Sequence, residues 1–81
     1  PFNPSTTIEF SLPRRSAVSL TIHNILGEKV RTLIDKDLPA GTYTIEWDGT
    51  SDRGVDMATG IYPYRIQTES GSLSRKMLLL K

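Results

Sequence analysis

Apolar and polar residues alternate along most of this chain with a period of two. A period of two places successive side chains on opposite faces of a strand, whereas an amphipathic helix repeats every 3.6 residues. Glycine, proline or short polar residues bound each alternating run and are typical of turns. The pattern therefore predicts strands and no helix. The predicted strands are residues 8–12, 18–23, 29–34, 43–47, 61–67 and 73–80.

Short strands at roughly ten-residue spacing, with turn signals between them, indicate an antiparallel β-sandwich. We expect an all-β, immunoglobulin-like fold of six or about seven strands, forming one domain over residues 1–81. Residues 1–5 are predicted to be an extended lead-in, because each proline disfavours the helical region for the residue before it. Residues 35–41 are predicted to be a connector. Pro63 interrupts one run and indicates a sheet edge or a bulge, since proline cannot donate to a ladder.

The composition excludes several classes of function. The sequence has ten Lys and Arg residues and nine Asp and Glu residues, so its net charge is close to zero. A near-neutral chain gives no electrostatic reason to expect nucleic acid or an anionic membrane as partner. The absence of cysteine excludes disulfide bonds, thiolate metal sites and a cysteine nucleophile. The chain begins at Pro1 without a signal-peptide pattern. We therefore expect a piece of a longer polypeptide.

The longest polar loop, residues 48–56, is the strongest candidate for a site. Asp48, Asp52 and Asp56 follow each other at four-residue spacing, and three carboxylates could place several oxygens around a Ca²⁺ ion. The spacing departs from an EF-hand loop, and Arg53 lies among the acids. The sequence therefore favours a polar turn, in which the aspartates cap backbone amides, over calcium binding. No other metal or cofactor is expected.

Catalysis is not expected from the titratable residues. His23 is the single histidine, it falls on the polar face of its strand, and it lacks the partners that a hydrolase requires. Glu9 and Glu46 also fall on outward positions, and nothing places a substrate cleft between them. The sequence therefore predicts no enzyme and no catalytic residue.

The aromatic residues fit two different roles. Exposed aromatic rings on a sandwich can stack on sugar rings, which would make the chain a carbohydrate-binding accessory domain of a secreted enzyme. The alternation instead places the rings on apolar faces beside isoleucines, so it favours a role in the core. The residues concerned are Tyr43, Trp47, Tyr62 and Tyr64.

The chain ends in an apolar run between basic residues, which we call the C-terminal run. It consists of Lys76, Met77, Leu78, Leu79, Leu80 and Lys81. The run is too short to cross a bilayer, so membrane insertion is not expected. Its apolar residues are predicted to hold the fold as the last strand, and its lysines are predicted to serve recognition.

Several short motifs occur in an order typical of one family. They occupy residues 1–8, 10–13, 18–20, 24–30, 38–43, 47–49, 58–62 and 75–81. This ordered set resembles the C-terminal sorting domains of the type IX secretion system. That family in turn resembles the immunoglobulin-like domain of the flagellar hook-capping protein, and sequence separates the two poorly. Pro63 departs from the aromatic or aliphatic residue that is usual at its position.

The resemblance implies a non-catalytic sorting and anchoring domain at the end of a larger exported protein, with catalytic or binding domains of the same chain upstream. Its partners would be the outer-membrane translocon and a cysteine-dependent sortase, with the C-terminal run as the recognised segment. The parent protein would cross the periplasm of a Gram-negative bacterium, of the Bacteroidetes or a neighbouring lineage, and be secreted or held at the cell surface. A structural immunoglobulin-like spacer or assembly domain is the first alternative, and the carbohydrate-binding domain is the second.

Overall fold

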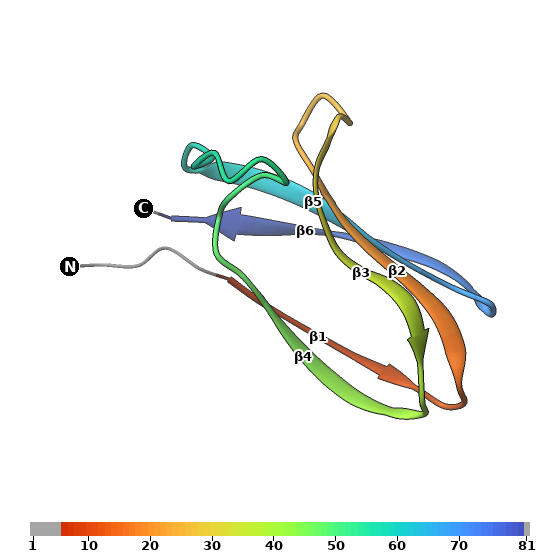
Figure 1. Ribbon diagram of the computed structural model, residues 1–81. Helices are drawn as coiled ribbons and strands as arrows, with labels where there is room; N and C mark the ends of the chain where they lie inside the picture. The colour runs from red at the N-terminus through yellow and green to blue at the C-terminus, as the bar shows by residue number, and fades with distance from the viewer. Residues whose placement is uncertain (1–5, 81) are drawn as a thin grey trace.

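The computed structural model describes residues 6–80, which form six strands and no helix (Figure 1). The described part therefore holds no helix that could cross a membrane. The predicted lead-in, residues 1–5, and Lys81 lie outside the described residues. The strands are β1 (Thr6–Leu12), β2 (Ser16–His23), β3 (Lys29–Leu38), β4 (Gly41–Trp47), β5 (Gly60–Thr68) and β6 (Gly71–Leu79).

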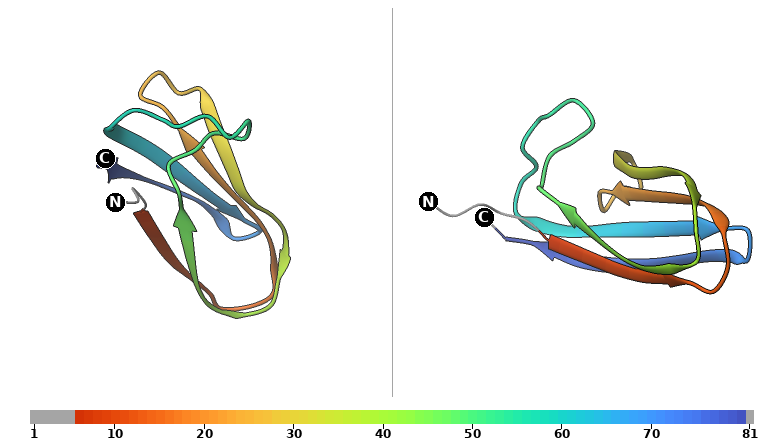
Figure 2. Two further views of the ribbon diagram at one scale, coloured as in Figure 1. Left: turned by 60° about the vertical axis from the view of Figure 1, so that its left-hand side comes forward. Right: turned by 60° about the horizontal axis from the view of Figure 1, so that its bottom comes forward.

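The strands form two sheets that pack face to face, as the further views in Figure 2 show. The smaller sheet contains β1 and β4, and the larger sheet has the order β3-β2-β5-β6. Every neighbouring pair is antiparallel. The predicted immunoglobulin-like sandwich is confirmed, with six strands in the described residues instead of about seven. A constant-type immunoglobulin sandwich has sheets of four and three strands, so among the described residues the smaller sheet is one strand short.

The core lies between the sheets and uses the alternating residues that the sequence predicts. β2 buries Val18, Leu20 and Ile22 while the residues between them face outward. Trp47 is 0% exposed and forms an edge-to-face pair with Tyr62, their ring centroids 5.1 Å apart. These two rings therefore belong to the core, where they cannot stack on a sugar.

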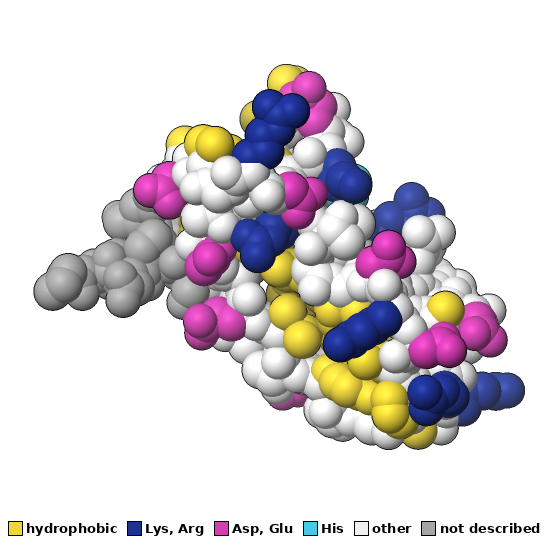
Figure 3. All heavy atoms as spheres, viewed as in Figure 1, with side chains coloured by type: hydrophobic (Ala, Val, Ile, Leu, Met, Phe, Trp, Pro, Cys, Tyr) yellow, Lys and Arg dark blue, Asp and Glu magenta, His cyan; other side chains and the backbone are white. Residues whose placement is uncertain are grey.

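The remaining aromatic rings lie at the margin of the core. Tyr43 stacks on Phe10 with ring centroids 5.3 Å apart, and both rings are partly buried. The Tyr43 hydroxyl donates to the carbonyl of Pro39 at 2.5 Å. Tyr64 is also partly buried against the core. Figure 3 shows apolar side chains reaching the surface in a band over β3 and β4, with charged side chains of both signs around it.

The prediction for β3 is wrong at its C-terminal end. Residues 35–38 continue the strand instead of forming a connector, and they pair with residues 16–19 of β2. Their exposed charges conceal the strand in the sequence, although charged residues are common on edge strands such as β3. The register also explains the adjacent Leu33 and Ile34: Ile34 lies opposite Leu20, Thr32 lies opposite Thr21, and Leu33 forms a bulge between them.

Pro63 lies in β5, an inner strand of the larger sheet. The ladder between β5 and β2 covers only Tyr64 to Gln67, so Pro63 precedes it. At that position β5 has a strand neighbour on one side only, where Pro63 lies opposite Lys76 of β6. The proline therefore stands at a local edge, as the sequence indicates, and interrupts no ladder with β2.

Candidate functional site

The loop after β4 is built around the side chain of Asp48. One carboxylate oxygen, Oδ1, accepts hydrogen bonds from the Thr50 amide at 3.0 Å and from the Thr50 hydroxyl at 2.6 Å. Ser51 Oγ accepts from the amides of Arg53 and Val55, each at 3.2 Å. These short-range bonds form the polar turn that the sequence favours, because each side chain satisfies backbone donors of its own loop.

The charge of Asp48 is stabilised by the same contacts. The Thr50 hydroxyl holds the pKa of Asp48 below its ordinary value of 3.8, the Thr50 amide lowers that pKa further, and the Arg31 charge adds to both. Asp48 is thus an ionised acceptor at neutral pH. Its oxygen is already engaged by donors of the protein.

Arg31 of β3 supplies the positive charge of this loop. Its Nη1 lies 3.6 Å from Asp48 Oδ1, and its Nε lies 3.8 Å from Asp52 Oδ1. Nη1 also donates to Thr50 Oγ1 at 2.7 Å. Sequence analysis missed Arg31 because it lies on another strand, and the alternation of β3 gives no sign of its partners.

The three carboxylates proposed for calcium do not gather. Asp48 and Asp52 converge on Arg31, whereas Asp56 lies in an isolated bridge with Thr50. Among residues 6–80, no group of three or more acidic or histidine side chains is arranged to hold a metal ion. A guanidinium therefore lies where the calcium interpretation requires a cation. The geometry supports the polar turn.

The same loop covers part of the outer edge of β3. The Asp52 amide donates to the Val30 carbonyl at 3.0 Å, and the Thr32 amide donates to Asp52 Oδ1 at 3.0 Å. Two edge groups of β3 thereby find partners in the loop. Such cover keeps a sheet edge from pairing with another chain. Asp48 and Asp52, two of the residues predicted as a candidate metal site, therefore stabilise the loop and its contact with β3.

Glu9 and Glu46 are diagonal neighbours on one face of the smaller sheet, whereas His23 lies on the larger sheet. His23 Nε2 lies 2.9 Å from Thr21 Oγ1 on the outer face of β2. Glu9 and Glu46 are exposed on the outer face of the smaller sheet, each opposite a threonine. Among the described residues, no hydrogen bond or ion pair joins His23, Glu9 and Glu46 into an acid–base pair.

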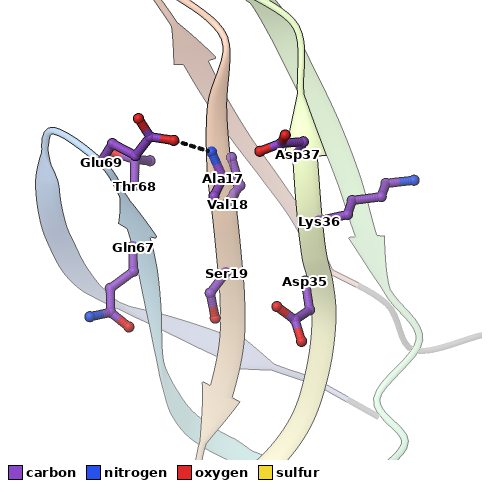
Figure 4. Close-up of a pocket in the computed structure, with 9 residues that line it drawn as sticks. All are labelled: Ala17, Val18, Ser19, Asp35, Lys36, Asp37, Gln67, Thr68 and Glu69. Atoms are coloured by element: carbon purple, nitrogen blue, oxygen red, sulfur yellow. Dashed lines mark hydrogen bonds between the residues drawn. The ribbon is translucent and has the colours of Figure 1, made fainter.

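A shallow hollow of about 320 Å³ lies on the outer face of the larger sheet. Figure 4 shows Asp35 and Asp37 of β3 on one side of β2 and Glu69, just after β5, on the other. One Glu69 oxygen accepts from the Ala17 amide at 3.1 Å. The Glu69 amide donates to the buried Ser16 hydroxyl at 3.0 Å. Glu69 thus fastens the β5–β6 turn to the start of β2, which is a structural role.

The C-terminal run lies mostly on β6, an edge strand of the larger sheet. Lys76 is exposed, Met77 is partly buried and Leu79 is 0% exposed. Leu78 and Leu80 are 53% and 57% exposed. The prediction that the apolar residues hold the fold is therefore confirmed for Met77 and Leu79 and wrong for Leu78 and Leu80. Alternation along the strand turns every second residue away from the core.

Comparison with known proteins shows to which family this chain belongs. The sequence matches the family described as the FlgD Ig-like domain over residues 3–72. The chain belongs to the FlgD Ig-like domain family. The match confirms the relation to the hook-capping protein that the motif order implies. It does not bear on the narrower expectation of a type IX sorting domain, which stays a prediction.

The solved structure of FlgD from P. aeruginosa has the same fold as this FlgD Ig-like domain. The two superimpose with a TM-score of 0.71 at 23% sequence identity. The alignment covers 93% of this chain and 59% of the solved one, so the domain spans less than two thirds of that chain. No curated protein matches the sequence. The family match also stops at Ser72 and leaves out the C-terminal run.

Proposed function

We propose that this FlgD Ig-like domain is a non-catalytic structural domain that helps to assemble a larger protein or complex. The family match over residues 3–72 carries the proposal. The site geometry agrees with it, because Arg31, Asp48 and Asp52 bind one another and the backbone. A domain of this kind acts through its surface and its rigidity, and the sandwich fold alone does not name its partner.

The placement of the strands favours assembly over simple spacing. β1 begins and β6 ends at the same end of the sandwich, as Figures 1 and 2 show. A domain whose first and last strands meet at one end projects sideways from its chain, so it adds little to the distance between its neighbours. Projection presents the opposite end and both outer faces to other proteins.

The proposal is tested by replacing the domain within the protein that carries it. The replacement is an unrelated six-stranded sandwich of similar size, whose first and last strands also meet at one end. We expect the replaced protein to fold but to lose association with its usual complex, measured by size-exclusion chromatography with light scattering. Normal association of the replaced protein would show that the surface of this domain is dispensable and would contradict the proposal.

Type IX sorting is a second candidate function, and the exposure of Lys76 on an edge strand supports it. An edge strand offers backbone groups that a receptor can pair with, and a basic side chain adds electrostatic specificity. We propose that the translocon and sortase of a Gram-negative bacterium would read Lys76, Leu78 and Leu80, which are exposed. The parent protein would then pass the periplasm and reach the cell surface or the medium.

Point substitutions separate this recognition from folding. Deleting residues 77–81 also removes buried Leu79, so a loss of export after that deletion has two explanations. Lys76→Ala leaves the core intact and is expected to reduce export of the parent protein, measured by surface labelling. Lys29→Ala, on the opposite edge strand β3, is the matched control because Lys29 is also exposed and lies opposite His23 on the outer face of the sheet. Equal export of both variants would reject a role for Lys76.

A further inference from the structure

The two sheets differ in width, and part of the inner face of β6 is left uncovered. Inward positions of β6 lie opposite buried residues of β5, and Leu73 lies opposite Ile66. Ile66 is 6% exposed, whereas Leu73 is 47% exposed. Leu73 therefore lies on the inner face of the larger sheet, but the smaller sheet does not cover it fully. The smaller sheet has two strands where the larger sheet has four, so it covers less width among the described residues.

A hollow of about 410 Å³ lies at this uncovered place. Phe10 and Leu12 of β1 line one side, Leu73 and Arg75 of β6 line the other, and Ile66 contributes from β5. Among the described strands, β1 pairs only with β4 and β6 pairs only with β5. The hollow is therefore bordered by two strands that each have a free backbone edge, and its apolar lining combines the core residues Leu12 and Ile66 with the exposed Leu73.

We infer that this hollow binds a short extended polypeptide segment, which pairs with the free edge of β1 as a third strand of the smaller sheet. The lining of β1 runs from Glu9 to Leu12, which corresponds to about four residues or about 13 Å of strand. Such a segment adds a third strand to the two that residues 6–80 contribute to the smaller sheet, which gives the strand number of a seven-stranded sandwich. Addition of a strand to a free edge is an established mode of peptide recognition.

Two charged side chains line the hollow, Glu9 of β1 and Arg75 of β6. Glu9 alternates with the inward residues of β1 and lies on the outer face of the smaller sheet, so Arg75 is the charged side chain that faces the inner side of the hollow. Arg75 lies on the inward face of β6, opposite Tyr64, and forms no ion pair with a described acid. Leu73, two residues earlier, presents apolar surface on the same face. The segment therefore carries apolar side chains at alternate, inward positions and one acidic side chain in that series, next to Arg75. Backbone pairing supplies affinity, and the alternating side chains supply specificity.

The inference is tested with a peptide and the isotope-labelled 81-residue chain. The probe has eight residues that alternate valine and threonine, with glutamate in place of one central valine, and the control peptide carries lysine there. NMR titration up to about 1 mM is expected to shift the amides of residues 9–12 and 73–75 saturably. A titration without saturable shifts, or with shifts confined to β3, would overturn the inference. Concentration-dependent shifts without peptide would identify a second copy as the occupant and would also overturn it.

Reversal of the charge gives a second, independent readout. Arg75→Glu is expected to exchange the preference, so that the lysine peptide binds about twofold to fivefold more tightly than the glutamate peptide. Arg65→Glu is the matched control, since Arg65 is exposed on β5 at an outward position opposite Ser74. An unchanged preference in Arg75→Glu, with folding verified by its NMR spectrum, would refute the acidic segment. Neither result depends on domain replacement, so failure here leaves the assembly proposal standing.

Discussion

Leu78 and Leu79 are adjacent leucines in one strand, and the structure predicts opposite consequences for the same substitution. Leu79 is 0% exposed and belongs to the core, whereas Leu78 is 53% exposed on the outer side of β6. Leu79→Ala removes buried methyl groups and leaves a cavity, while Leu78→Ala removes groups that water already reaches. The two leucines share the same strand and differ in the face of the sheet to which they point.

The expected magnitudes differ by several kcal/mol. A fully buried leucine replaced by alanine costs about 3 to 5 kcal/mol where the site cannot collapse. Leu79 Cδ1 lies 3.2 Å from the point where a Cβ on Gly49 would stand, so the loop backbone closes over this side chain. Leu78→Ala is expected to change the free energy of unfolding by less than about 0.5 kcal/mol. A chain of this size has a total stability of roughly 4 to 12 kcal/mol.

Urea unfolding followed by the fluorescence of Trp47 measures both variants, because Trp47 is buried in the folded state and exposed on unfolding. With a urea dependence of about 1 to 1.5 kcal/mol per molar, the midpoint for Leu79→Ala is expected to fall by about 2 M or more. The midpoint for Leu78→Ala is expected to stay close to that of the original chain. Equal midpoints for the two variants would refute the inward and outward assignment of β6.

Two further substitutions test the loop after β4. Gly49→Ala is expected to destabilise the fold by about 1 kcal/mol or more, because Gly49 has a φ of +82° and a Cβ there would meet Leu79. A neutral effect on the thermal unfolding temperature would contradict this expectation. Asp48→Asn tests the lowered pKa of Asp48. Since the folded pKa lies below the unfolded value, the carboxylate stabilises the fold above pH 3.8 and this advantage disappears as the pH falls through the folded pKa. The stability difference between the two proteins should therefore shrink on acidification, and a difference that grows would reverse the assigned direction.

Local pattern was sufficient to predict most of the fold. Val18, Leu20 and Ile22 alternate cleanly, so their strand and its buried face follow from the period of two. β3 was predicted too short because Asp35, Lys36 and Asp37 hide the apolar pattern. On an edge strand, exposed charges are compatible with pairing on the other side. A hydrophobic pattern predicts which residues are buried. It predicts backbone pairing only where the paired residues are also buried.

The candidate site was less predictable because its contacts join distant parts of the sequence. Asp48 and Asp52 were chosen by their spacing, but their charge partner is Arg31 on another strand. The hollow beside Leu73 depends on the relative widths of two sheets, a property of the whole topology. No local run of residues encodes that difference, so only the assembled structure reveals the uncovered leucine.

The cover that Asp52 gives to β3 limits how copies of this domain can associate. One edge of the larger sheet is partly closed by the loop at Val30 and Thr32, while the other edge, β6, has no strand partner beyond β5 among residues 6–80. A continuous fibril of stacked strands requires two open edges on every subunit. The loop hinders the addition of a strand at Val30 and Thr32 of β3, whereas β6, β1 and β4 keep open edges among the described residues. A row of paired strands that runs through the larger sheet is therefore interrupted at the covered part of β3, and backbone pairing is left to the other edges.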